Sequence, residues 1–165
     1  MKFRRLYRDE LEALREDFVI FLAKNGYDAA GWTKLTATEA PRHGELLDEF
    51  SERVFANVIS RLDYLEHRMP RDLRAYRCGK DKIEMIGLLV KGETTVDLSD
   101  ENTPPAELFR QIQESGAALQ LYRAERAYRS EDRGADLFQL MEGGALISKE
   151  GELFKLLGNV AEGAN

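Results

Sequence analysis

The sequence predicts an α+β fold in which N-terminal helices and one long central helix pack on a small, mostly antiparallel sheet. In the first half, apolar residues recur at the spacing of an amphipathic helix. After Pro70 the pattern changes to the alternation that is typical of strands, and helical patterns then return between further strands. Helices followed by strands mixed with helices indicate an α+β domain rather than a doubly wound sheet.

The first helix is expected from Asp9 to Lys24, with the pair Asn25-Gly26 as its C-cap. Its FVIFL run is apolar on all sides, so we expect the last turns of this helix to be more deeply buried than its first turns. A short helix that carries Trp32 is expected at residues 28–35.

The central helix is expected from Glu45 to Glu66 and is the clearest element of the sequence. Pro41 suits its first turn, and Pro70 stops the helical pattern. We expect residues 41–68 to form one uninterrupted helix whose apolar side is covered by strands. The residues of that side recur at intervals of three and four; they are Leu47, Phe50, Val54, Val58, Leu62 and Leu65.

Two polar residues, Ser51 and Arg61, fall inside the apolar arc of this helix. Two interpretations of Arg61 are open. A snorkelling side chain at the edge of the arc would keep its guanidinium in water. A buried guanidinium would instead hold a carboxylate or the phosphate of a ligand. The burial of Arg61 distinguishes the two interpretations.

Strands and shorter helices are expected after Pro70, beginning with a hairpin of Leu73–Cys78 and Lys82–Val90. We expect residues 1–158 to form a single α+β domain and residues 159–165 to form a flexible tail. The other expected elements are a short strand at 94–98, a helix at 104–115, a strand at 118–124, a helix at 130–143, a short strand at 145–147 and a helix or strand at 152–157.

The composition excludes several classes of protein. The 165 residues carry a net charge of −6, so the mean field of the chain repels polyanions, although bases cluster at residues 68–91. The single cysteine, Cys78, excludes an internal disulfide and fits a reducing compartment. No apolar run is long enough to span a bilayer, and the N-terminus lacks the pattern of a signal peptide. We therefore expect a cytoplasmic protein without a membrane partner.

The sequence contains no familiar catalytic motif, so we expect no catalytic residue, no cofactor and no metal ion. A GxxxxGK(S/T) loop, a GxGxxG turn, HExxH and GxSxG are all absent. His43, His67 and Cys78 do not have the spacing of a zinc site. Cys78 with His67 is the one nucleophile–base pair that the sequence offers, and the alternative is that Cys78 is a small buried apolar residue.

Two series of arginines, each repeating at about every third residue, form the strongest functional pattern. One interpretation is that these arginines pair with the acids of the helices. The other is a groove for RNA, another phosphate-bearing ligand or an acidic peptide, because a guanidinium binds phosphate or carboxylate through two hydrogen bonds. The candidate ligand-binding residues are Arg68, Arg71, Arg74, Arg77, Arg123, Arg126 and Arg129, with Arg133 continuing the second series.

Several segments together resemble a known family. In chain order they are YLEHRMPRDLRAYRC, DKIEMIGL, RAERAYR and DLFQLMEGGALISKEGELFKLL. The family that they resemble consists of small cytosolic proteins of Bacteroidetes-type bacteria with a domain of unknown function, and the resemblance extends over nearly the whole chain. It implies a single-domain protein of this length, and it implies no activity, cofactor or catalytic residue.

The apolar content, the mixed charge and the missing catalytic motifs favour a non-enzymatic protein-interaction module. The expected partner is a second copy of the chain in a homodimer, or another protein, bound through an exposed sheet or helix face. The alternative is a protein that binds RNA or a phosphate ligand through an arginine-rich surface. Rising salt would weaken phosphate binding steeply and would leave an apolar interface little changed.

Overall fold

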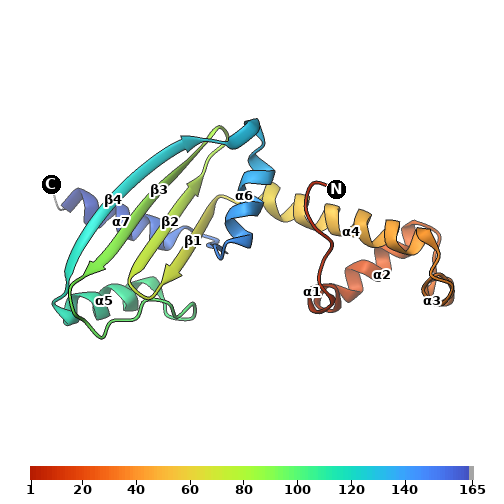
Figure 1. The fold of residues 1–165 in the computed structure, drawn as a ribbon, viewed down its shortest axis with the longest axis horizontal. Coiled ribbons are helices and arrows are strands. Elements are labelled where there is room, and N and C mark those ends of the chain that lie inside the picture. The colour runs from red at the N-terminus through yellow and green to blue at the C-terminus, as the bar shows by residue number, and fades with distance from the viewer. Residues whose placement is uncertain (164–165) are drawn as a thin grey trace. The chain divides into compact units, whose positions relative to one another are not determined.

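The computed structural model describes residues 1–163 and divides the chain into two compact units between Ser60 and Arg61. The second unit holds an antiparallel sheet with its own helices, so the chain is α+β (Figure 1). Each unit has an apolar core. That the two units form one domain over residues 1–158 stays a prediction. The helices of the first unit are α1 (Arg8–Ala13), α2 (Arg15–Lys24), α3 (Ala29–Ala37) and α4 (Pro41–Ser60).

The helix that was expected over residues 9–24 is divided into α1 and α2 at Leu14, whose φ of −105° and ψ of 21° leave helical geometry. The end of α2 at Asn25 agrees with the predicted cap, because Gly26 adopts a φ of +86° that favours glycine. Asp28 caps α3 and accepts the N–H of the first turn at 2.7 Å.

The central helix α4 ends at Ser60, so our prediction of an uninterrupted helix over residues 41–68 is wrong beyond that residue. The chain continues as strand β1 (Tyr64–Met69), which pairs along its whole length with β2 (Asp72–Cys78). Leu65 fits a helical stripe as well as it fits the buried side of a strand. The sheet partner decides between the two, because tertiary pairing overrides a local pattern.

The apolar side of α4 is covered by helices of its own unit. Leu46 and Phe50 are buried together with Phe18, Phe21 and Leu22 of α2. The rings of Phe18 and Phe50 have centroids 4.9 Å apart. Helices α2 and α3 therefore provide the cover that we expected from strands.

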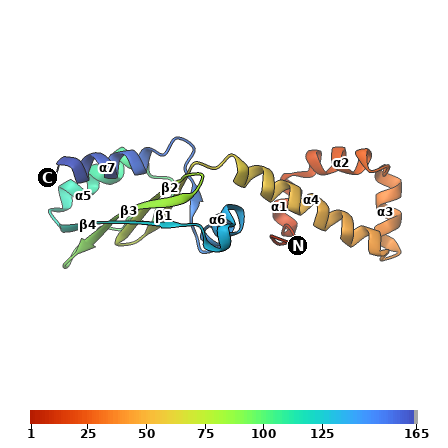
Figure 2. The same cartoon turned by 90° about the horizontal axis from the view of Figure 1, so that it is seen from above.

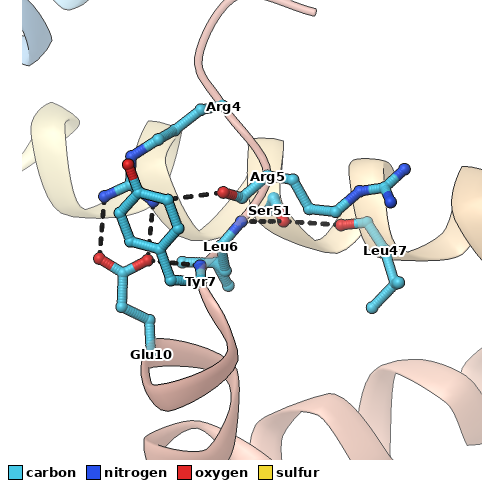
Figure 3. A network of polar contacts seen from close by, with 7 residues as sticks. All are labelled: Arg4, Arg5, Leu6, Tyr7, Glu10, Leu47 and Ser51. Carbon is cyan, nitrogen blue, oxygen red and sulfur yellow. Dashed lines mark hydrogen bonds and ion pairs between the residues drawn. The ribbon is translucent and has the colours of Figure 1, made fainter.

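The two polar residues of the apolar arc have different environments. Arg61 follows α4 and is exposed, so its interpretation as a buried guanidinium is wrong. Ser51 is only 1% exposed, and its hydroxyl donates to the Leu47 carbonyl at 2.7 Å. The same oxygen accepts the N–H of Leu6 at 2.9 Å (Figure 3). Ser51 therefore fixes the N-terminal segment to α4 and has no unsatisfied polar atom.

A second part of this network closes the start of α1 (Figure 3). Arg4 donates to both carboxylate oxygens of Glu10, at 2.7 and 2.8 Å, and its Cζ lies 3.9 Å from the centroid of the Tyr7 ring. Glu10 also accepts the backbone N–H of Tyr7 at 2.7 Å, as in a capping box. The Arg4 guanidinium holds the pKa of Glu10 below its ordinary value. These contacts tie the segment to α1 as well as to α4.

The remaining strands of the second unit are β3 (Lys82–Lys91), β4 (Ala118–Ala127) and β5 (Leu146–Ile147). The sheet has the strand order β4-β3-β2-β1-β5, and all neighbouring strands are antiparallel. The predicted hairpin is confirmed as β2 and β3. Residues 94–98 form no strand, although Leu98 is buried and its N–H donates to the Pro70 carbonyl at 2.9 Å.

Helices α5 (Pro105–Ser115) and α7 (Glu152–Gly163) cover one face of the sheet, which we call the helix-covered face (Figure 2). Helix α6 (Arg133–Glu142) lies against one end of the opposite face, which we call the α6 face. The core of the helix-covered face consists of Leu73, Ala75, Ile86, Leu88, Val90, Leu98, Leu108, Ile112, Leu153 and Leu157.

The last element, α7, extends to Gly163. The tail that we expected over residues 159–165 is thus helical up to that residue, and residues 164–165 lie outside the described residues. Among the described helices, none combines the length and the apolar character needed to cross a membrane.

Candidate functional site

The first arginine series is distributed over both faces of the sheet. Arg68 of β1 lies opposite Leu73 and belongs to the helix-covered face, as does Arg77 of β2. Arg74 lies opposite Gly87 on the α6 face. Side chains alternate between the two faces of a strand, so a spacing of three residues cannot keep them on one side.

Most arginines of this first series have a partner within the chain. Arg68 has a side chain only 3% exposed, pairs with Glu66 at 2.9 Å and donates to the Asp100 carbonyl at 2.8 Å. Arg77 pairs with Glu84. Arg71, in the turn between β1 and β2, donates to a backbone carbonyl. These contacts favour the interpretation that the series supports the sheet.

Arg74 belongs to a polar cluster on the α6 face whose centre is Tyr122. The Tyr122 hydroxyl donates to Asp72 at 2.5 Å and accepts from Arg74 Nε at 3.2 Å. The ring lies directly on Gly87, because a Cβ at that position would be 2.0 Å from Tyr122 Cζ. Burial and the hydrogen bond to Asp72 raise the pKa of Tyr122 to about 12. The phenol is therefore neutral at pH 7, and the cluster positions a ring rather than a base.

The second arginine series also separates. Arg126 of β4 donates to both oxygens of buried Asp136 in α6, one of them at 2.8 Å. Arg133, at the start of α6, donates to the carbonyls of Gly79 and Leu62. Arg126 and Arg133 therefore hold α6 against the end of the sheet.

Arg123 and Arg129 are the exposed members of this series. Arg123 lies on β4, and among the described residues its side chain has no hydrogen bond or ion pair. Arg129 is in the short 3₁₀ helix η1 (Arg129–Glu131), and its backbone N–H donates to Asp136. The structure does not bring the seven predicted arginines into one groove, and ligand binding by them stays a prediction.

One cavity of about 530 Å³ does contain two of the predicted arginines, Arg77 and Arg123, beside the ring of Phe154. Its lining also includes the carboxylates of Glu84, Glu125 and Glu162. A cavity with this mixture of charges does not favour an anion over a cation.

Cys78 and His67 do not form a nucleophile–base pair. His67 lies opposite Arg74 in the register of β1 and β2, so it is four residues, or about 13 Å, from Cys78 along the sheet. His67 lies instead against Gly144, where an added Cβ would be 2.8 Å from its Nε2. Cys78 is 3% exposed and unpaired. Among the described residues, no group of three or more His, Cys, Asp or Glu side chains could hold a metal ion.

Cys78 is expected to resist alkylation in the folded protein. Burial raises the pKa of its thiol to about 12, so almost no thiolate exists at pH 7, and the sulfur is shielded as well. Incubation with iodoacetamide at pH 7, followed by mass spectrometry, should show labelling only after denaturant is added. Labelling of the native protein at the rate of a free thiol would contradict this expectation.

The clearest exposed apolar feature lies on α2. Phe21 and Leu22 are buried as the FVIFL run predicted, but Val19 and Ile20 are 57% and 55% exposed. A cavity of about 690 Å³ lies between α1, α2 and α3, and its lining includes Val19 and Trp32 but not Ile20. A helix that is apolar on all sides is normally buried on all sides. The all-round apolar FVIFL run therefore indicated this surface in the sequence, although we predicted only deeper burial from it.

The comparisons with known proteins place the chain in a family. It matches the family of unknown function DUF6495 over residues 1–162 and belongs to that family. No curated protein and no solved structure matches the chain. The match agrees with the resemblance to an uncharacterised family, whereas a Bacteroidetes-type origin stays a prediction. No functional residue is transferred from the family.

Proposed function

We propose that the chain is a non-enzymatic protein-interaction module that binds an amphipathic partner helix in the cavity between α1, α2 and α3, which we call the groove. The observation that carries the proposal is Val19, a large aliphatic side chain of α2 that lines the groove and is 57% exposed. Full burial of such a side chain contributes about 1.5 to 3 kcal/mol, and roughly half of that is unrealised while Val19 faces water. A docking partner would recover that energy.

The lining of the groove specifies the apolar side of the partner. It is formed by side chains of α1, α2 and α3 and by Tyr27 between α2 and α3. The lining residues of α2 recur at intervals of three and four, which suits a partner helix with apolar residues at the same intervals, a common mode of peptide recognition. The apolar lining residues are Leu11, Phe18, Val19, Leu22, Ala23, Tyr27, Ala29 and Trp32.

The rim of the groove specifies the charge of the partner. Its two acids are Glu12 and Asp28. The one base of the lining, Arg15, lies 3.7 Å from Glu12 and compensates only part of this charge. A rim with an excess of acids attracts lysine and arginine and repels phosphate. We therefore propose a partner helix with basic residues on both sides of its apolar stripe.

The chain carries its own reporter for this test, because its one tryptophan, Trp32, lines the groove. The probe is a synthetic helical peptide with leucines on one side and lysines on the other. Titration should shift the Trp32 emission to saturation, and the same peptide with glutamate in place of lysine should bind more weakly. The absence of a saturable shift with the lysine peptide would reject the groove as a docking site.

Matched variants distinguish binding in the groove from nonspecific hydrophobic binding. Val19→Ser should weaken peptide binding about tenfold, because a small cluster of residues dominates such interfaces. Val58→Ser is the control, since Val58 is an exposed valine of α4 that does not line the groove. Equal affinity of Val19→Ser and the control variant would contradict the proposal.

RNA or phosphate-ligand binding is the alternative, and the exposure of Arg123 and Arg129 is the observation in its favour. A labelled oligouridylate replaces the peptide in the same titration. Binding that falls steeply with salt, and that is lost when both arginines are changed to alanine, would support this alternative over the interaction module. A cytoplasmic location is also part of our proposal, supported by a sequence that contains a single cysteine.

A further inference from the structure

The two edges of the sheet differ in a way that points to a partner. At one edge, β5 has only two residues, and an edge this short offers little backbone for pairing. At the other edge, β4 has ten residues and pairs with β3 from Ala118 to Ala127 without a bulge. β4 contains neither glycine nor proline, and most of its residues are exposed. A long regular edge of this kind is a template for another strand.

Geometry restricts how two copies of β4 can pair. Two antiparallel edge strands are related by a two-fold axis perpendicular to the sheet, and this axis keeps each face on its own side. Residues of the helix-covered face therefore lie opposite residues of the same face. The axis then passes midway between the two copies of one residue of β4, and we name the axis by that residue. Each choice of that residue fixes every cross-strand pair.

The charges of β4 select one position for the axis. An axis at Arg123, Glu125 or Arg126 places that residue opposite its own copy, and like charges directly opposite are destabilising. An axis at Ala124 places Arg123 opposite Glu125 of the second copy, and Glu125 opposite Arg123 of the second copy. Tyr122 and Arg126 would also be opposite in the register, but each side chain is already held within its own copy, Tyr122 by Asp72 and Arg74 and Arg126 by Asp136. The pair of Arg123 with Glu125 therefore selects the axis, because both residues then face an opposite charge.

The pairs inside one copy favour the same arrangement. Arg123 has no partner among the described residues, and in the register with β3 it lies opposite Ile86. Glu125 lies directly opposite Glu84, a like charge, and Lys82 bridges the two at 3.1 and 3.7 Å. A guanidinium beside Glu125, in addition to the Lys82 ammonium, would reduce this repulsion, and an axis at Ala124 supplies it.

We infer that two copies of the chain join through their β4 strands, antiparallel and centred on Ala124, to form one continuous sheet across the dimer. Pairing from Leu121 to Ala127 satisfies backbone groups that the single copy leaves to water. Arg123 and Glu125 set the register. This interface and the groove between α1, α2 and α3 are different surfaces, so either proposal can fail while the other stands.

Charge reversal tests the interface by light scattering and analytical ultracentrifugation. The unaltered chain should be a dimer. Arg123→Glu alone and Glu125→Arg alone should each weaken self-association about tenfold or more, because each places two like-charged pairs across the axis. An equimolar mixture of the two variants should form a heterodimer with opposite charges at both pairs, and the double variant should dimerise alone. A monomeric parent chain, or reversals without effect on self-association, would overturn the inference.

Cysteine cross-linking tests the register independently. At the axis, the two copies of residue 124 have Cα atoms about 4.5 to 5.5 Å apart, which is within the range of a disulfide. Ala124→Cys should therefore give a covalent dimer under mild oxidation. Gln120→Cys is the control, because its two copies would lie about 27 Å apart. Cys78 does not interfere, since it is buried. Cross-linking at position 120 but not at position 124 would reject this register.

Discussion

Gly87→Ala is expected to lower the free energy of unfolding of the sheet unit by about 3 to 5 kcal/mol, from overpacking together with a lost hydrogen bond. The added methyl would stand 2.0 to 2.4 Å from three carbons of the Tyr122 ring. The ring cannot tilt away freely, because Asp72 and Arg74 hold its hydroxyl. Urea denaturation followed by circular dichroism measures the loss.

Two variants make this prediction specific. Gly158→Ala is the matched control, because a Cβ there would meet Ile86 at an ordinary 3.7 Å and alanine favours the helix α7. It should leave stability unchanged or raise it slightly. In a Tyr122→Ala background, Gly87→Ala should cost much less than in the unaltered chain, since the clashing ring is gone. An equal cost in both backgrounds would show that the ring is not the cause.

Asp136→Asn is expected to lower the free energy of unfolding by about 2 to 3 kcal/mol at pH 7. Asp136 is 6% exposed and accepts hydrogen bonds from Arg126 and from the backbone N–H of Arg129. The amide removes the charge that both donors face. The loss stays below that of a fully buried pair, because the Arg126 side chain is 38% exposed and water can reach it.

The pH dependence separates the charge of Asp136 from its shape. The Arg126 guanidinium holds the pKa of Asp136 below its ordinary value. The ionised form therefore contributes stability in full above about pH 4, and this contribution is lost as the pH falls through the lower pKa of the folded state. The parent chain and Asp136→Asn should thus converge in stability toward pH 2. Glu107→Gln is the control, because the surface pair of Glu107 with Arg110 should give little change. A constant difference from pH 7 to pH 2 would contradict the charge argument.

The sequence predicted the elements with a strong period and missed the point where two periods overlap. The hairpin of β2 and β3 was expected nearly residue by residue, because its alternation and turn are local. The end of α4 was not, since Leu62 and Leu65 fit a helix and a strand equally well. Only the pairing of β1 with β2 decides, and pairing is not visible in a pattern of apolar residues.

The candidate site was less predictable than the fold. Arg68 and Arg126 looked like ligand groups, but their carboxylate partners are decided by the sheet register and by the position of α6. For Val19 and Ile20 the situation is the opposite, because the sequence pattern indicated an unusual apolar surface. An all-round apolar helix was visible in the sequence, and only the packing of α2 shows which of its sides stays in solvent.

The hydrogen bond that the Phe3 backbone N–H donates to the Glu52 carboxylate has a consequence for folding during synthesis. This bond, the bond from the Leu6 N–H to Ser51 and the core of the first unit all lie within residues 1–60. This unit can consequently close during synthesis, before any strand of the sheet has left the exit tunnel. When the β strands emerge, Phe18 and Phe50 are already buried. Fewer exposed apolar side chains are then available for incorrect contacts with the strands.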